Sequence, residues 1–170
     1  CRDLLRDNKL VLFSGTPCQI AGLNHFLKKK YDNLLTMEVI CHGVPSPKVY
    51  KKYIRNIERR KRKKVRSVCF RSKDTGWENY SVKYQYEDGN IDLIKHQDDL
   101  YNQIFLSNQA LRNSCYNCCF KRGKSNADIT CGDFWGIRNV VPKMADNSGV
   151  SLVFCYDDKG KKYLDLIAPY

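Results

Sequence analysis

The sequence lacks several features that would place it outside the ordinary globular proteins. No apolar run approaches the roughly 20 residues that a membrane-spanning helix needs, and no signal peptide is visible. We therefore expect a cytoplasmic protein without a membrane span. Internal repeats and low-complexity linkers are also absent. Acidic residues are scarce, because 18 Asp and Glu stand against 30 Lys and Arg, and the resulting net charge of +12 bears on partners rather than on fold.

The length and composition indicate one folded domain. A chain of 170 residues is long enough for a substantial core and too short for two ordinary domains. Apolar residues make up 42% and charged residues 28%, which excludes an intrinsically disordered protein. The chain begins with Cys1 rather than Met. We therefore expect a domain cut from a longer protein.

The nine cysteines are the most informative part of the composition. Disulfides, buried apolar packing and metal binding compete to explain them. Disulfide scaffolds are usually short and secreted, whereas this chain has an odd number of cysteines and no export signal. Cys69 and Cys155 fall within apolar strands and are predicted to be buried packing residues. Metal binding is the favoured role for some of the others.

Strands and helices alternate along the chain in the pattern of an α/β protein. We predict a mixed, largely parallel sheet with flanking helices, a β-hairpin insertion and a Cys-rich cluster-binding loop. Asp88-Gly89 between alternating strands marks the hairpin turn. Strands are predicted at 9–13, 34–41, 65–71, 80–86, 91–94, 127–131 and 151–156, and helices at 18–29, 48–60, 99–111 and from 159 onward.

A basic run at residues 59–66 supplies most of the net charge. Seven of its eight residues are Lys or Arg, and without them the charge of +12 falls to +5. The run is either a phosphate-binding patch for nucleic acid or the solvated end of a helix, where cations are favoured. No nucleic-acid-binding motif accompanies it. A solvated helix end, or a surface that docks an acidic protein partner, is therefore preferred, and nucleic acid is disfavoured as a partner.

Four cysteines occupy positions typical of metal ligands. Cys115-x-x-Cys118 has the spacing with which two thiolates hold one ion or one cluster corner. Cys18 opens a helix after a strand and a Gly-Thr-Pro turn, where the helix N-terminus favours a thiolate. Cys41 ends the next strand, and parallel strands direct their carboxyl ends to one crevice. Four thiolates suit either a [4Fe-4S] cluster or zinc.

Three further cysteines, Cys1, Cys119 and Cys131, stay undecided, and Cys1 lies too close to the end of the sequence to interpret. Cys119 adjoins Cys118 and can take its place as a ligand, since adjacent residues on a loop can exchange roles. Cys131 ends a predicted strand, and its surroundings favour neither packing nor ligation.

Several sequence blocks together resemble a known protein family. The blocks occur in the family's order and extend over essentially the whole chain. They are Phe13-Ser-Gly-Thr-Pro-Cys-Gln-Ile-Ala-Gly-Leu23, Ile40-Cys-His-Gly-Val-Pro-Ser46, Phe70-Arg-Ser-Lys73 with Gly76-Trp77, Leu111-Arg-Asn-Ser-Cys-Tyr-Asn-Cys118 and Ala127-Asp-Ile-Thr-Cys-Gly-Asp-Phe-Trp-Gly136. On these blocks the chain resembles the coenzyme F420 hydrogenase/dehydrogenase beta-subunit family, mainly its C-terminal part.

The resemblance implies an iron–sulfur flavoprotein with FAD and a [4Fe-4S] cluster. It implies an oxidoreductase that passes electrons between a partner protein and a small redox substrate, which is coenzyme F420 in the archetypes. The partner is a ferredoxin-like acidic protein or a hydrogenase/dehydrogenase subunit. The family's recurring cysteines fall on Cys18, Cys41, Cys115 and Cys118. Residues 1–170 then form a single C-terminal domain that lacks the family's N-terminal part and can be inactive alone.

The glycine-containing loop before the first helix is a candidate cofactor site. Gly15, Thr16 and Gln19 can approach a phosphate or the edge of the flavin, because a glycine loop at a helix N-terminus suits anions. Simple capping of the helix explains Thr16 and the following proline equally well.

Other candidate residues lie at strand ends and turns. Arg71 and Lys73 can bind the FAD pyrophosphate or an acidic substrate, or they lie at a solvated strand end. His42 is the candidate proton donor, with a hydrogen-bonded turn histidine as the alternative. Asp133 can bond a ribityl hydroxyl group or its own turn.

Three function classes remain at this stage. A flavin- and iron–sulfur-dependent oxidoreductase is favoured. The alternative is a zinc- or cluster-stabilised binding module without catalysis. A nucleic-acid binder depends only on residues 59–66 and is the least favoured of the three.

Overall fold

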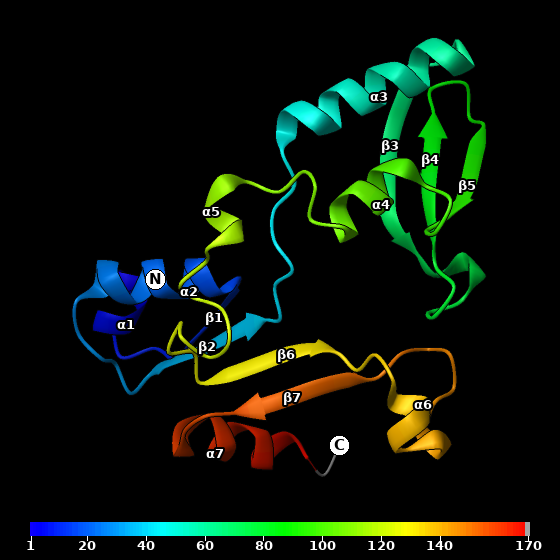
Figure 1. The fold of residues 1–170 in the computed structure, drawn as a ribbon. Helices are drawn as coiled ribbons and strands as arrows, with labels where there is room; N and C mark the ends of the chain where they lie inside the picture. The colour runs from blue at the N-terminus through cyan, green and yellow to red at the C-terminus, as the bar shows by residue number, and fades with distance from the viewer. Residues whose placement is uncertain (169–170) are drawn as a thin grey trace. The chain divides into compact units, whose positions relative to one another are not determined.

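The computed structural model describes residues 1–168 and confirms a mixed α/β architecture (Figure 1). The chain divides into two compact units. The first unit contains residues 1–41, 118–140 and the described residues from 150 onward, and the second contains residues 42–117 and 141–149. The first unit is therefore assembled from three separate stretches of chain. None of the helices within residues 1–168 has the length and apolar character needed to cross a membrane.

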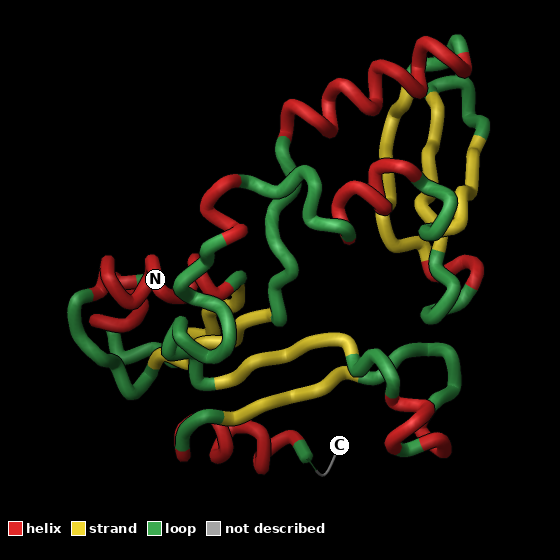
Figure 2. The backbone as a smooth tube through the Cα atoms, in the orientation of Figure 1, coloured by secondary structure: helices red, strands yellow, loops and turns green. Residues whose placement is uncertain are grey.

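The first unit is built on a four-stranded sheet with the order β1-β2-β6-β7 (yellow in Figure 2). Its strands are β1 (Val11–Gly15), β2 (Leu34–Val39), β6 (Ile129–Asp133) and β7 (Ser151–Cys155). β1 and β6 both pair with β2 in parallel, and β7 runs antiparallel to β6. The predicted mixed, largely parallel sheet is thereby confirmed.

Helices complete the first unit. Leu23 and Leu27 of α2 pack with Leu5 and Leu34 in a buried cluster, because the spacing of four residues places both on one helix face. α7 lies along β7 in Figure 1. The helices of this unit are α1 (Arg2–Arg6), α2 (Pro17–Leu27), α6 (Ile137–Val140) and α7 (Asp158–Ile167).

The second unit contains an antiparallel three-stranded sheet with the order β3-β4-β5. Residues 87–90 connect β4 to β5, so the hairpin predicted from Asp88-Gly89 is confirmed. The strands are β3 (Val65–Ser72), β4 (Ser81–Tyr86) and β5 (Ile91–Lys95). The helices are α3 (Pro47–Lys61), α4 (Leu100–Leu106) and α5 (Asn113–Tyr116), with short 3-10 turns η1 (Lys73–Thr75) and η2 (Pro142–Met144).

The core of the second unit lies between β4 and α3. Val82, Tyr84 and Tyr86 are buried on one face of β4, as the two-residue period of a strand dictates. Ile54 and Ile57 of α3 pack against them. α3 is therefore fixed to the sheet by an apolar face, and its remaining surface carries the charges.

Two local predictions were wrong. The helix predicted over 99–111 ends at Leu106, and Asn108 adopts a left-handed conformation with φ of 63°, which stops a right-handed helix. Cys69 is exposed and not a buried packing residue. The irregular pairing of β3 with β4 between Cys69 and Ser72 interrupts the alternation on which the prediction depended.

Candidate functional site

The carboxyl ends of β1 and β2 lie side by side in the first unit. Gly15, the last residue of β1, pairs with Glu38 of β2. α2 begins at Pro17, just after β1, and Cys41 follows shortly after the end of β2. Cys18 and Cys41 therefore follow adjacent parallel strands, as the sequence predicted, at the type of sheet edge where α/β proteins bind ligands.

The first turn of α2 is held by contacts among predicted site residues. Thr16 donates its backbone N–H and its hydroxyl to Oε1 of Gln19, over 2.9 and 3.1 Å. A Cβ at Gly15 would lie 3.0 Å from the same oxygen, so glycine permits this close approach. Oγ1 of Thr16 also lies 3.2 Å from Sγ of Cys18. Capping accounts for Thr16 and Gln19, and their contact with a cofactor stays a prediction.

A cavity of about 280 Å³ opens beside Cys41, and we name it the Cys41 cavity. Strand β2 contributes Glu38 to its wall, α2 contributes Pro17, and the loop before β6 contributes cations. Its lining residues include Pro17, Glu38, Cys41, Lys121, Arg122 and Tyr156. Of the two cysteines predicted to share a crevice, Cys41 lines this cavity, and α2 contributes Pro17 rather than Cys18.

The chemistry of the Cys41 cavity suits an anionic ligand with an apolar or planar part. Lys121 and Arg122 supply positive charge, and an Arg guanidinium can hold a carboxylate or phosphate with two hydrogen bonds. Phe154 and Tyr156 line the same cavity and are 43% and 54% exposed. Exposed aromatic rings in a cavity are available for stacking with a ligand.

Backbone strain marks the loop that carries these cations. Arg122 and Gly123 have φ values of 62° and 74°, in the left-handed region that side chains disfavour. A Cβ at Gly123 would lie 3.3 Å from Cζ of Tyr156, so the loop passes close to that ring. The two left-handed residues make the turn that brings the loop against Tyr156.

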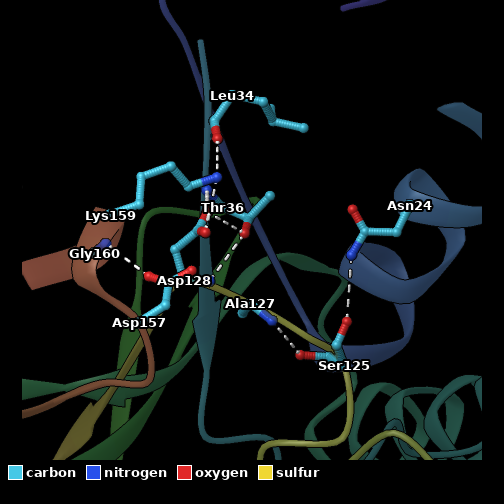
Figure 3. Close-up of polar contacts among 9 residues, drawn as sticks. All are labelled: Asn24, Leu34, Thr36, Ser125, Ala127, Asp128, Asp157, Lys159 and Gly160. Carbon is cyan, nitrogen blue, oxygen red and sulfur yellow. Dashed lines mark hydrogen bonds and ion pairs between the residues drawn. The ribbon is translucent and has the colours of Figure 1, made fainter. Parts of the chain in front are cut away.

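A buried carboxylate supports the floor of the Cys41 cavity. Glu38 is 2% exposed. The Thr130 hydroxyl donates to its Oε1 over 2.8 Å, and the Ser125 hydroxyl donates to its Oε2. Ser125 also accepts at its hydroxyl from the Ala127 N–H and at its carbonyl from the Asn24 amide (Figure 3). These bonds connect β2, β6, α2 and the loop, and they fix the position of the loop.

A second buried carboxylate, Asp128, joins the strands next to this network (Figure 3). Its Oδ2 accepts the backbone N–H and the hydroxyl of Thr36, each over 2.7 Å. Its Oδ1 lies 2.8 Å from Nζ of Lys159. Burial opposes ionisation of Asp128, but the Lys159 ammonium and the Thr36 bonds outweigh it and hold the pKa of this carboxyl below its ordinary value.

Four predicted site residues belong to the second unit: His42, Arg71, Lys73 and Cys115. Nε2 of His42 is 3.1 Å from the carbonyl oxygen of Phe105, and the two rings are 4.7 Å apart. This contact favours the interpretation of His42 as a hydrogen-bonded turn histidine. Sγ of Cys115 accepts the backbone N–H of Val44 over 3.4 Å.

Arg71 packs among aromatic rings. Its guanidinium carbon lies 5.1 Å from the ring centre of Tyr80 and 5.8 Å from that of Trp77, which is buried. Nζ of Lys73 is exposed and lies 3.5 Å from the Ser148 carbonyl. Arg71 is thus tied to the packing of the second unit. For both residues, a role in binding FAD stays a prediction.

The predicted metal ligands are divided between the two units. Cys18, Cys41 and Cys118 belong to the first, Cys115 belongs to the second, and none of the nine cysteines forms a disulfide. Thiols have the donor chemistry of an iron–sulfur cluster. Within residues 1–168, however, no three His, Cys, Asp or Glu side chains lie close enough to hold one metal. Joint ligation of one cluster by these four cysteines stays a prediction.

Cys131 and Cys155 lie on the neighbouring strands β6 and β7. Burial raises the pKa of both thiols, and Cys155 further raises that of Cys131. Burial thus keeps both thiols protonated in the chain as it stands. Cys119 is exposed in the loop that follows α5.

A complete dinucleotide does not fit the Cys41 cavity. Pockets that enclose a drug-sized ligand usually measure about 300–1,000 Å³. The Cys41 cavity, at about 280 Å³, has room for one part of FAD or for a small substrate. Asp133, a further predicted cofactor contact, is exposed at the end of β6.

Sequence reasoning missed several residues of the Cys41 cavity. Glu38 carried a signal, because a carboxylate within an otherwise apolar predicted strand must find buried partners. Lys121 and Arg122 follow directly after the cysteine-rich segment and precede Gly123, which is a typical turn sequence. Tyr156 gave no signal, because its position depends on the pairing of β7 with β6.

Comparison with models of known protein families places the chain. A family model for the C terminus of the coenzyme F420 hydrogenase/dehydrogenase beta subunit matches residues 8–169. None of the curated proteins matches the chain.

Proposed function

The chain belongs to the coenzyme F420 hydrogenase/dehydrogenase beta-subunit family, and from this membership we propose that it is the electron-transfer domain of an iron–sulfur flavoprotein oxidoreductase. The family implies a redox function of the hydrogenase/dehydrogenase beta-subunit type. It also implies a hydrogenase or dehydrogenase subunit as a partner. The observation that carries the proposal is the match over nearly the whole chain together with the cysteines that follow β1 and β2.

We propose that Cys18, Cys41, Cys115 and Cys118 provide the thiolates of a [4Fe-4S] cluster. Support comes from the Cys115-x-x-Cys118 spacing and from the positions of Cys18 and Cys41 after adjacent parallel strands. Zinc accepts the same four ligands and is the alternative, which would make the chain a stabilised binding module.

We also propose FAD as a cofactor and a small redox substrate, of the coenzyme F420 type. A flavin supplies two-electron hydride chemistry and a cluster supplies one-electron transfer, while the protein binds and orients. Gly15, Thr16 and Gln19 are proposed to approach the cofactor at the start of α2, with Asp133 as a further contact. The cations Lys121 and Arg122 fit the Cys41 cavity to an acidic ligand group.

Three residues of the second unit complete the proposed set. Arg71 and Lys73 are proposed to bind the FAD pyrophosphate or an acidic substrate tail, since Arg pairs well with phosphate oxygens. His42 is proposed as the proton donor in the reaction, because an imidazole N–H is a common proton donor in catalysis.

Anaerobic purification followed by metal and flavin analysis tests this function. We expect iron, acid-labile sulfide and FAD in stoichiometric amounts, with flavin absorption bands over a broad shoulder that reductant bleaches. Stoichiometric zinc without labile sulfide would overturn the cluster and support the binding module. A shoulder without flavin bands would leave a cluster module and remove FAD from the proposal.

A further inference from the structure

A groove runs between α3 and α4 in the second unit, apart from every predicted site residue. Its volume is about 600 Å³. Val49 and Tyr53 of α3 form one apolar wall, and Leu100, Tyr101 and Ile104 of α4 form the other. Leu100 is 54% exposed, although an apolar side chain of this size is usually covered. We name this feature the α3–α4 groove.

Three cations border the α3–α4 groove along a single helix face. Lys52, Arg55 and Arg59 line it, and their spacing of three and four residues places them in one row on α3. Within residues 1–168, no carboxylate lies within ion-pair distance of any of the three. Glu58 offsets part of the charge of Arg55, and Arg59 donates to Oδ1 of Asn56 over 3.2 Å, but none of the three cations is engaged in an ion pair among the described residues.

The basic run at 59–66 differs in this respect. Lys61 pairs with Asp92 at 2.7 Å, Lys63 with Asp88 at 2.8 Å, and Lys64 with Glu58 at 3.2 Å. Its lysines are thus partly neutralised by the hairpin and by α3 itself. Arg59, the first residue of the run, also belongs to the row that borders the α3–α4 groove.

Ring stacking and a hydrogen bond to a buried carboxylate fix the side chains at the base of the α3–α4 groove. The Tyr53 and Tyr101 rings stack with centroids 5.5 Å apart. The Tyr53 hydroxyl donates to Oδ2 of Asp99 over 2.9 Å, and Asp99 is 1% exposed. A preformed apolar floor lowers the entropic cost of binding, because its side chains are already ordered.

We propose that the α3–α4 groove docks an acidic electron-transfer protein, which inserts an apolar side chain between α3 and α4 and places carboxylates against Lys52, Arg55 and Arg59. The choice of an electron-transfer partner rests on the redox function proposed above. Charge complementarity directs the encounter, and the buried apolar contact supplies the affinity.

The charges and the walls of the groove argue against other occupants. A second copy of the chain carries a net charge of +12 and would be repelled by the same row of cations. Nucleic acid is bound mainly through phosphates on open basic surfaces. The groove walls carry the aliphatic side chains of Val49, Leu100 and Ile104, which cannot bind phosphates.

Titration calorimetry with an acidic [2Fe-2S] ferredoxin as the probe, at low and at moderate salt, tests the proposal. We expect Arg55→Glu/Arg59→Glu to weaken binding by about tenfold or more, since reversing two interface charges adds repulsion. We expect Leu100→Asp to abolish binding, because it places a carboxylate in the apolar contact. Leu100→Met keeps the volume and should retain binding.

Lys161→Glu/Lys162→Glu is the matched control, since it makes the same change in net charge on two exposed residues of α7 in the first unit. Equal loss of binding in this control would overturn the proposal in favour of unspecific attraction. Failure of the ferredoxin to bind would also overturn it. The proposal would likewise be overturned if the chain formed a dimer that Leu100→Asp disrupts. It would also be overturned if the chain bound an oligonucleotide through Arg55 and Arg59.

Binding and cofactor content are measured independently. If the chain contains iron, sulfide and FAD but does not bind the ferredoxin, the proposed function stands and the docking proposal fails. If the chain binds the ferredoxin at the α3–α4 groove but contains only zinc, the docking proposal stands and the proposed redox function fails. The two proposals can therefore fail separately.

Discussion

The ammonium of Lys159 lies 2.8 Å from Oδ1 of Asp128 and also donates to the carbonyl of Leu34 over 2.7 Å (Figure 3). One side chain at the start of α7 therefore joins β2 and the start of β6. Asp128 in turn holds Thr36 of β2 through its other oxygen. The parallel pairing of two strands from distant parts of the chain is thus secured by one ion pair.

Lys159→Met should destabilise the first unit by about 1–3 kcal/mol. Removing one partner of a buried pair costs about 3–5 kcal/mol, but Lys159 is one-third exposed, and solvent screening reduces the loss. Urea unfolding followed by circular dichroism measures the change. Lys161→Met, on the exposed side of the same helix, is the control and should cost less than about 0.5 kcal/mol.

The same pair predicts a dependence on acid. Because the pKa of Asp128 is depressed in the folded chain, its contribution is present above the ordinary Asp pKa of about 3.9 and is lost as the pH falls through the folded value. Lys159→Met should therefore lose less further stability than the unaltered chain as the pH falls below about 4, because the ammonium no longer holds down the pKa of Asp128. Identical acid profiles for the two chains would contradict the assignment.

Single Cys→Ser substitutions at Cys18, Cys41, Cys115 and Cys118 should each remove most of the iron and labile sulfide, because serine is a poor ligand for this cluster. The readout is metal and sulfide content after anaerobic purification. Cys69→Ser is the control, since Cys69 is exposed on β3 and outside the proposed set. Retention of full iron content in any of the four variants would remove that cysteine from the ligand set.

Tyr84→Phe should lower the free energy of unfolding by about 1–3 kcal/mol. The Tyr84 hydroxyl donates to Oδ2 of the buried Asp99 over 2.6 Å, and removing it leaves that oxygen with fewer donors. Tyr86→Phe should cost less, about 0.5–1.5 kcal/mol, because Asp92 keeps its ion pair with Lys61. Thermal unfolding measures both variants. If Tyr84→Phe and Tyr86→Phe lose the same stability, the bond to Asp99 is not what distinguishes Tyr84.

Tyr84 also predicts a response to alkali. Burial, with the bonds to Asp99 and Tyr53, raises the pKa of Tyr84 above its ordinary value. Its contribution to stability is therefore complete below about pH 10, the ordinary tyrosine pKa, and declines as the pH rises further. Tyr84→Phe should make the decline above pH 10 less steep, which alkaline unfolding curves measure. Tyr86, whose pKa burial raises to about 12, accounts for part of the remaining slope.

Alanine substitutions at two glycines with positive φ distinguish the cost of backbone strain from the cost of side-chain overpacking. Gly149 has φ of 96°, and a Cβ there would lie 2.5 Å from Cδ1 of the buried Trp77. Gly89, in the β4–β5 turn, has φ of 83° and open space around it. Gly89→Ala should cost about 1 kcal/mol. Gly149→Ala should cost at least about 2 kcal/mol more, because it adds overpacking. Trp fluorescence during urea unfolding measures the loss of stability in both variants. Equal losses would contradict the close approach of Gly149 to Trp77.

Local signals in the sequence predicted most elements within a few residues. The run from Leu34 to Cys41 contains β2, and the turn Ser14-Gly-Thr-Pro17 marks the start of α2. Asp88-Gly89 predicted the β4–β5 turn correctly. These elements depend on neighbouring residues, namely apolar periodicity, capping and turn chemistry. The strand–helix alternation then led to the correct fold class.

Features that depend on distant residues were not predictable in the same way. The division into two units and the pairing of β2 with β6 join residues about as far apart as Thr36 and Asp128. The alternation within the chain says which face of a strand is buried, but not which strand covers its edge. The Cys41 cavity was missed in part for this reason, since Lys121, Arg122 and Tyr156 reach it only through that pairing.

The three-part assembly of the first unit constrains how the chain can fold during its synthesis. Asp128 follows its partner Thr36 by 92 residues, so β2 must wait with an unpaired edge until β6 has left the ribosome. The β3–β4–β5 sheet connects only neighbouring segments and is completed earlier. During translation the inserted unit can therefore condense first, while the exposed edge of β2 is a site where a chaperone would protect the nascent chain from aggregation.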